Sequence, residues 1–207
     1  MLKNNGRFFL ISGFLLVFLS VALFGRNLIM DFQAGDNSAE ALTYLEDIID
    51  NSENNNSDYD ASLFNNAAFY YSNPEIEMPV TFVGDVSYIG ILQIPSINLR
   101  LPVIDSFSYQ YLEYAPCRYY GSVYEKNLVI AAHNYYFHFG QLANLEPGNE
   151  VVFIDSHGTK FNYRTVLIET LNPNDVSGMC SDEWDLSLFT CTLGGQYRTT
   201  VRCKSAD

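Results

Sequence analysis

The sequence predicts a mostly β fold, in which a closed β-barrel with a few short helices is preceded by one transmembrane helix. Two observations carry this prediction. Seven short runs of β-type residues, separated by Pro, Gly and Asn, follow one another in about 125 residues from Val80 onward. A continuous apolar stretch near the N-terminus comes before them. The length of 207 residues suffices for one well-buried core with accessory segments, and it is too short for two large cores.

The apolar stretch Phe8–Gly25 has 18 residues and no charge, which is about the minimum for a helix to cross roughly 30 Å of hydrocarbon. Lys3 and Arg7 precede it, so the positive-inside rule places residues 1–7 in the cytoplasm and the rest of the chain outside. A cleaved signal peptide is the alternative, because Ser20–Ala22 resembles a cleavage site. The apolar run continues beyond that site, and this favours an uncleaved anchor.

Residues 26–79 are predicted to form an acidic stalk rich in Asn and Asp. From Asp31 onward this segment contains eleven acids and no Lys or Arg. Ala39–Ile49 spaces its apolar residues at helical intervals, with Ser38 as a possible N-cap, so a short helix is expected that either packs on the domain or belongs to the stalk. The composition of Asp50–Asn66 indicates an unstructured spacer.

Residues 80–207 are predicted to form the folded domain. Its strand candidates contain many β-branched and aromatic residues, and each has the length of a strand. Short helices are expected at Tyr109–Tyr119 and Phe139–Leu145. The seven strand candidates are Tyr88–Ile97, Leu99–Asp105, Asn127–Asn134, Glu150–Ser156, Lys160–Leu171, Asp185–Cys191 and Arg198–Lys204.

The last two strand candidates are separated by a turn that contains Gly194–Gly195, which can supply positive φ values. If the two strands pair as an antiparallel hairpin, Cys191 lies opposite Arg198 on one face, and Ser187 lies opposite Arg202 on the same face. The other face is apolar and holds Leu186, Leu188, Val201 and Cys203. We therefore expect Cys203 to be in the core and Cys191 to be outside it.

A cysteine at a strand end beside a guanidinium gains stabilisation of its thiolate, so Cys191 is a candidate nucleophile. His133 ends the apolar run LVIAAH and opens onto a loop, which makes it the candidate acid and base. We interpret His138 and His157 as structural. The alternatives for the three candidates are a buried inert thiol, a structural histidine and, for Arg198, a surface ion pair.

Composition also excludes some functions. The net charge of −13 argues against a nucleic-acid partner, since such partners require clustered Lys and Arg. No metal site and no cofactor are predicted, because three acids that could bind calcium lack a ligand spacing: Asp105, Glu113 and Asp155. The remaining cysteines are expected to be free thiols rather than a disulfide: Cys117, Cys180 and Cys203.

Taken together, IAAHNYYFHFGQL, SLFTC and the downstream Arg198 resemble the motifs of the sortases, the membrane-anchored transpeptidases of Gram-positive bacteria. Those motifs are a histidine after an apolar strand, then T-L-x-T-C, then an arginine. The resemblance covers roughly Val80–Asp207 and includes GILQIPSINLRLPVI and the NPND sequence at Asn172–Asp175. It implies an eight-stranded barrel, and it also implies an N-terminal anchor.

The resemblance further implies a reaction. Cys191 attacks the carbonyl after the Thr of an LPxTG-like sorting signal and forms a thioester, and the acyl group then passes to an amine. His133 protonates the departing amine, and Arg198 binds the substrate backbone or the oxyanion. Thr190, next to Cys191, contributes to the same binding of the substrate. The implied partners are surface proteins with a C-terminal sorting signal and the amine of a cell-wall peptidoglycan precursor.

The chain departs from the family pattern in two places. Ser187 stands where the family usually has Thr, and the interval from cysteine to arginine is short, which leaves Arg202 as a rival of Arg198. The lack of a lid motif and the wording HNYYFHFG and CTLGG favour a class D-like enzyme over a pilin-polymerising one, with a housekeeping sortase as the alternative. Two other functions stay open, a cysteine peptidase that hydrolyses similar peptides and a non-catalytic, membrane-tethered binding domain.

Overall fold

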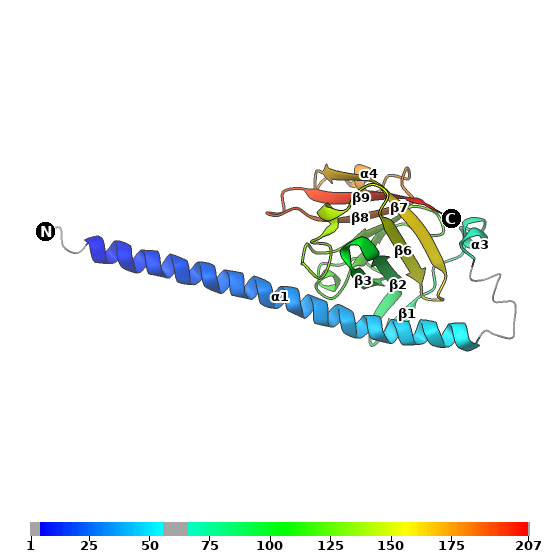
Figure 1. Ribbon diagram of the computed structural model, residues 1–207, viewed down its shortest axis with the longest axis horizontal. Coiled ribbons are helices and arrows are strands. Elements are labelled where there is room, and N and C mark those ends of the chain that lie inside the picture. The colour runs from blue at the N-terminus through cyan, green and yellow to red at the C-terminus, as the bar shows by residue number, and fades with distance from the viewer. Residues whose placement is uncertain (1–4, 56–65, 207) are drawn as a thin grey trace. The chain divides into compact units, whose positions relative to one another are not determined.

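The structure is a computed structural model, and it describes residues 5–55 and 66–206 (Figure 1). Helix α1 (Asn5–Asn55) contributes residues to two units, one that ends at Gln33 and one that begins at Ala34. In the first unit, an 18-residue window of the helix has a mean hydropathy of 2.5 and no buried residue. By length and composition this helix could cross a membrane, a criterion that a signal sequence also meets.

The second unit holds nine strands and the short helices α3 (Ala67–Tyr71) and α4 (Val176–Met179) among its described residues. Most strands lie within one to three residues of the bounds expected from the sequence, since the runs of β-type residues end at Pro, Gly and Asn. The strands are β1 (Thr81–Val83), β2 (Val86–Ile94), β3 (Leu99–Ile104), β4 (Cys117–Tyr120), β5 (Leu128–Ala131), β6 (Glu150–Asp155), β7 (Lys160–Leu171), β8 (Leu186–Cys191) and β9 (Arg198–Ser205).

These strands form one sheet in the order β1-β2-β3-β4-β5-β8-β9-β7-β6. An additional antiparallel pairing between β2 and β6 closes the sheet, so β2 to β9 form an eight-stranded barrel and β1 is an extra strand on β2. Two pairings are parallel, β3 with β4 and β5 with β8. The closed eight-stranded barrel with short helices is therefore confirmed (Figure 1).

The expected helix at Tyr109–Tyr119 is wrong. Only Tyr111–Glu113 forms a turn of 3₁₀ helix. From Cys117 onward the chain forms β4, a barrel strand that is absent from the seven strand candidates and that pairs with β5. Pro116 removes a helix donor at this point, and the tyrosines after it suit a strand. At Phe139–Leu145, the structure forms only the 3₁₀ turn Leu142–Asn144.

Two apolar clusters lie on opposite faces of the strands, as the period of two requires. The first fills the barrel interior and includes Leu188, Val201 and Cys203. The second lies on the outer face and includes Phe189 and Ala131 of the strands and Ala41, Leu45 and Ile49 of α1. The strands are thus covered on both faces in this region. A site on the outer face can therefore be partly enclosed by the segments that cover it.

The C-terminal part of α1 packs on the barrel. Ala41, Leu45 and Ile49 are buried against strand residues of the outer cluster, and Glu46 forms an ion pair with Arg100 of β3 at 2.6 Å. Of the two alternatives for the expected helix Ala39–Ile49, packing on the domain is the one observed.

The part of the chain before Val80 also contributes to the barrel interior. In α3, Tyr70 is buried and stacks on Tyr124 with ring centroids 4.3 Å apart. Of the expected spacer Asp50–Asn66, the residues to Asn55 belong to α1, and 56–65 lie outside the described residues. The compact unit therefore includes segments ahead of the strand-rich residues 80–207.

Candidate active site

The candidate site is built on the ends of two parallel strands. In the register of β5 and β8, Ala131 lies opposite Phe189, and the amide of Ala132 donates a hydrogen bond of 3.2 Å to the carbonyl of Phe189. His133 and Cys191 each follow two residues after this pair. Parallel strands run in the same direction with the same rise per residue, so His133 and Cys191 lie at the same end of the barrel.

The β8–β9 hairpin has the register expected from the sequence. Cys191 pairs with Arg198, and Ser187 pairs with Arg202. Gly194 and Gly195 have φ values of +86° and +73°, which the intervening turn requires. Cys203 is fully buried and Cys191 is half-buried, so the expectation for both cysteines is confirmed.

His133, Cys191 and Arg198 line one cavity of about 170 Å³, so the structure brings the three candidates together. The floor of the cavity is formed by Ala131 and Phe189 of the outer apolar cluster. The cavity therefore joins polar, reactive groups to an apolar surface, the combination typical of a substrate pocket.

Two cavity walls were not expected from the sequence. One wall is aromatic and contains Phe107, Tyr109 and Tyr119, whose rings form edge contacts with one another and with Phe189. The other wall is α4 with its preceding turn, in which the Asp175 carboxylate accepts a hydrogen bond of 2.9 Å from the amide of Gly178. The available sequence signal was the NPND turn followed by a glycine, which is a capping pattern.

His133 is half-buried at the edge of this cavity. Burial lowers its pKa below the ordinary value of 6.5, and the negative charge of Glu113 partly opposes this shift. The ring of Tyr135 packs on the His133 ring with centroids 4.8 Å apart. His133 is therefore mainly neutral at pH 7 and can accept a proton.

Arg198 and its rival Arg202 have different environments. The Nη1 group of Arg198 donates to the carbonyls of Gly195 at 3.2 Å and Tyr197 at 3.1 Å, and no carboxylate among the described residues lies within 4 Å of its guanidinium. Arg202 has a side-chain exposure of 2% and forms an ion pair with Glu169 at 2.8 Å. Its other donors bind Ser187 and the carbonyls of Gly178 and Met179. Arg202 is a structural residue whose donors are already used.

The four cysteines are free thiols in the structure. Burial raises the pKa of Cys117 to about 12 and also raises the pKa of Cys203 and of Cys180. These three thiols are thus held in their unreactive, protonated form at neutral pH. Cys191 alone among the four lines the candidate cavity.

Thr190 also lines the cavity, although its side chain points to the face of β8 opposite Cys191. Its hydroxyl is buried and has no hydrogen-bond partner among the described residues. Two of the acids considered for calcium are engaged by other groups. Asp105 pairs with Arg118 at 2.5 Å, and Asp155 accepts a hydrogen bond of 2.8 Å from Tyr124.

Comparison with known protein families decides the identity of this fold. The sequence matches the family model of the sortase domain over residues 92–206, which is more than half of the chain. The chain belongs to the sortase family. Members of this family are cysteine transpeptidases that act on sorting signals, so this sortase is an enzyme of that class. No curated protein sequence matches the chain.

Solved sortase structures have the same fold. Sortase C1 from Streptococcus agalactiae matches with a TM-score of 0.59 at 18% identity, covering 80% of this chain and 98% of that one. Sortase C from Clostridium perfringens with a C-terminal cell wall sorting motif matches with a TM-score of 0.54 at 24% identity, covering 78% and 98%. A lid mutant of sortase A from Corynebacterium diphtheriae matches with a TM-score of 0.53 at 19% identity, covering 68% and 90%. Identities this low establish the fold alone, and a class D-like subclass stays a prediction.

Proposed function

We propose that this sortase cleaves an LPxTG-like sorting signal and transfers the acyl group through a thioester on Cys191 to an amine of the cell wall. The observation that carries the proposal is the meeting of Cys191, His133 and Arg198 in one cavity at the ends of β5, β8 and β9. The cavity also has an apolar floor, which suits the Leu and Pro side chains of such a signal.

In the first half-reaction, neutral His133 takes the proton of the Cys191 thiol, and the thiolate attacks the carbonyl carbon after Thr of the signal. The C–N bond breaks, and protonated His133 gives its proton to the departing amine. A thioester on Cys191 remains, and His133 is neutral again. In the second half-reaction, the acceptor amine attacks the thioester, the C–S bond breaks, and the amine proton passes through His133 to the Cys191 thiolate.

Arg198 is proposed to stabilise the negative charge on the substrate carbonyl oxygen as the tetrahedral species forms. Its Nη1 group binds loop carbonyls, which orients the guanidinium, and the remaining donors have no partner among the described residues. Thr190 is proposed to shape the cradle next to Cys191, where it lines the cavity.

We further propose that Phe8–Gly25 anchors the enzyme in the cell membrane, with residues 1–7 in the cytoplasm and the barrel outside. The support is the exposed, uncharged stretch Phe8–Gly25 of α1, which follows Lys3 and Arg7 in the sequence. The partners in this arrangement are surface proteins that carry a C-terminal sorting signal and the amine of a peptidoglycan precursor.

The test is mass spectrometry of the full chain in detergent micelles after incubation with a panel of LPxTG-type peptides, first without and then with a glycine amine. We expect an acyl adduct on Cys191 that disappears when the amine is added, with release of the amide product. Cys191→Ala should form no adduct. Cys180→Ala is the matched control, because Cys180 is also half-buried but lies outside the cavity, and it should behave as wild type.

The products separate the proposed function from its alternatives. An adduct that resolves only into free acid, at the same rate with and without the amine, would identify a cysteine peptidase. Absence of any adduct across the whole panel would contradict the proposal and favour a non-catalytic binding domain.

A further inference from the structure

The loop that carries His133 is fixed by its own side chains and backbone. Phe139 is fully buried in the barrel interior, and its amide donates a hydrogen bond of 3.1 Å to the carbonyl of His133. The amides of His138 and Gly140 both donate to the carbonyl of Tyr135, at 3.0 Å and 2.9 Å. The residues from His133 to Gly140 therefore form one hydrogen-bonded unit.

This loop is attached to α1 through His138. The His138 side chain is fully buried, and its Nε2 atom lies 3.0 Å from the Ser38 hydroxyl and 3.3 Å from the carbonyl of Ala34. The Ser38 hydroxyl lies 2.7 Å from the carbonyl of Tyr114 and donates a hydrogen bond to it. Tyr114 directly follows the 3₁₀ turn Tyr111–Glu113.

The direction of these bonds follows from the donor inventory. A hydroxyl has one proton, and Ser38 uses it for the carbonyl of Tyr114. The Ser38 oxygen must therefore accept from His138, and the carbonyl of Ala34 can only accept as well. Nε2 of His138 carries the proton, and a directed chain runs from the His133 loop through Ser38 to the 3₁₀ turn.

The two segments joined by this chain flank the candidate active site. His133 lines the cavity from one segment, and Leu112 lines it from the other. Glu113, whose charge acts on His133, belongs to the second segment. The side chain of Ser38 thus contacts both of the segments that flank the cavity of Cys191.

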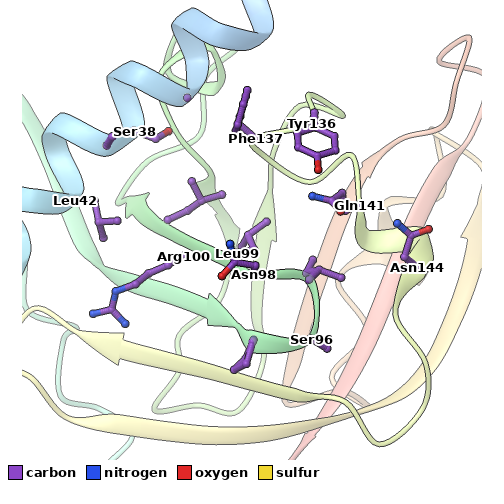
Figure 2. Close-up of a pocket in the computed structure, with 15 residues that line it drawn as sticks. Ser38, Leu42, Ser96, Asn98, Leu99, Arg100, Tyr136, Phe137, Gln141 and Asn144 are labelled. Atoms are coloured by element: carbon purple, nitrogen blue, oxygen red, sulfur yellow. The ribbon is translucent and has the colours of Figure 1, made fainter.

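Packing around Ser38 supports the same arrangement. A second cavity of about 620 Å³ lies between α1, the β2–β3 turn and the His133 loop, and it is lined by Ser38 and Phe137 (Figure 2). A Cβ atom at Gly35 would lie 3.1 Å from the Phe137 ring, so α1 approaches the loop closely at this turn. The His133 loop faces open space on this side, and the contacts of Phe137 and His138 with α1 border that space.

We propose that Ser38 and His138 are positioning residues of the transpeptidase reaction, because their hydrogen-bonded chain fixes the His133 loop and the Tyr111–Glu113 turn at one separation. This inference rests on the proposed role of His133. Loss of these hydrogen bonds leaves Cys191 in place on β8 and shifts His133 relative to Cys191. Misplacement of a proton donor by about 1 Å is enough to lower a rate by one to two orders of magnitude.

The experiment compares variants of the full chain in detergent micelles. Ser38→Ala removes the link, and His138→Leu removes the same link from the other side. We expect each to lower kcat about tenfold and to change KM less than about twofold, because the peptide still meets the same cavity. The double variant should lose no more than either single one, since both changes break the same chain.

Two variants serve as controls. His138→Gln retains an N–H donor near the position of Nε2 and should keep kcat within about threefold of wild type. Thr43→Ala changes an exposed hydroxyl on the same helix, which bonds only to the carbonyl of Ala39 in its own helix, and should leave kcat unchanged.

An NMR titration of the His133 ring separates positioning from general destabilisation. Burial lowers the pKa of His133, so a loosened loop in Ser38→Ala should raise its titration midpoint toward the ordinary value. The charged and titratable groups that act on His133, contact it or share its cavity are unchanged in this variant. They are Glu113, Tyr135, His138, Tyr109, Tyr119, Asp175, Cys191 and Arg198.

The outcomes are distinct for the two proposals. Equal kcat values for Ser38→Ala and Thr43→Ala, or a lower kcat with an unchanged His133 midpoint, would overturn the positioning role. Wild-type enzyme that transfers no peptide would overturn the proposed function instead. In that case the His133 midpoint in Ser38→Ala still decides whether the chain fixes the loop.

Discussion

At the scale of single residues, Arg198 and Arg202 show how two identical side chains on one face of one strand take different roles. Arg202 lies beneath α4, where burial forces each of its donors to find a partner. Arg198 lies at the open end of the hairpin, where only loop carbonyls reach it. The position along β9, rather than the residue type, separates a structural arginine from a candidate for oxyanion binding.

This difference predicts opposite phenotypes. Arg198→Ala should leave the free energy of unfolding unchanged and lower kcat by a factor of about 10² to 10³, as loss of an oxyanion donor does. Arg202→Ala should destabilise the fold by about 3 kcal/mol or more, because Glu169 loses its buried partner and two main-chain carbonyls lose their donor. Urea unfolding together with peptide-transfer kinetics measures both quantities. A catalytic loss in the second variant without a loss of stability would reverse the assignment.

At the scale of elements, the closure of the barrel depends on a close approach between β2 and β6. Gly90 of β2 pairs with Asp155 of β6, and its φ is +151°. A Cβ atom at this position would lie 2.0 Å from the carbonyl oxygen of Ile154. Only glycine permits the two strands to come within hydrogen-bonding distance here.

Gly90→Ala should therefore lower the free energy of unfolding by about 3 kcal/mol or prevent folding, since main-chain atoms must move. Gly84→Ala is the matched control, because Gly84 also has a positive φ, +60°, but nothing lies within 4 Å of an added Cβ. Its destabilisation should be about 1 kcal/mol. Thermal unfolding of both variants provides the test, and equal midpoints would contradict the importance of this contact for closure.

The elements also show what the sequence could predict. The β8–β9 register followed from one glycine pair and from the apolar face that Leu186, Leu188, Val201 and Cys203 form, and the structure has the same register. The strand β4 was missed because it has only four residues and forms a single parallel contact with β3. Alternation over so short a run is uninformative.

The candidate site was predictable to the same extent. Cys191 ends β8 and His133 lies two residues beyond the end of β5, so local patterns identify them. The aromatic wall with Tyr109 and the α4 wall reach the cavity through tertiary packing, and no local period reports such contacts. Ser38 was expected only as a helix cap, yet it lies inside a longer helix and binds a loop 100 residues away.

At the scale of the whole molecule, His138 links stability to pH. Burial lowers the pKa of His138 to about 4. The folded state therefore favours the neutral ring, and the unfolded state binds a proton once the pH falls below about 6.5. Stability from this residue is complete above about pH 6.5 and is lost as the pH falls toward about 4.

The wild-type chain should lose about 2 kcal/mol of its free energy of unfolding through His138 between pH 7 and pH 5. The His138→Gln variant has no titratable side chain at this position. The free energy of unfolding of this variant should therefore fall by about 2 kcal/mol less than that of the wild type over this interval. Urea unfolding of both proteins at the two pH values isolates this difference from the contributions of Asp155 and His133, whose pKa values are also shifted. Parallel pH dependences in the two proteins would contradict it.

The packing of α1 on the barrel has a practical consequence for shortened versions of the enzyme. A fragment that starts at Val80 would lack Leu45 and Ile49, and the apolar surface around Tyr88 and Ile91 would be exposed to water. Such a fragment would be prone to aggregation and would also lack Ser38. For a water-soluble version that retains this covering layer, the cut belongs between Gln33 and Ala34.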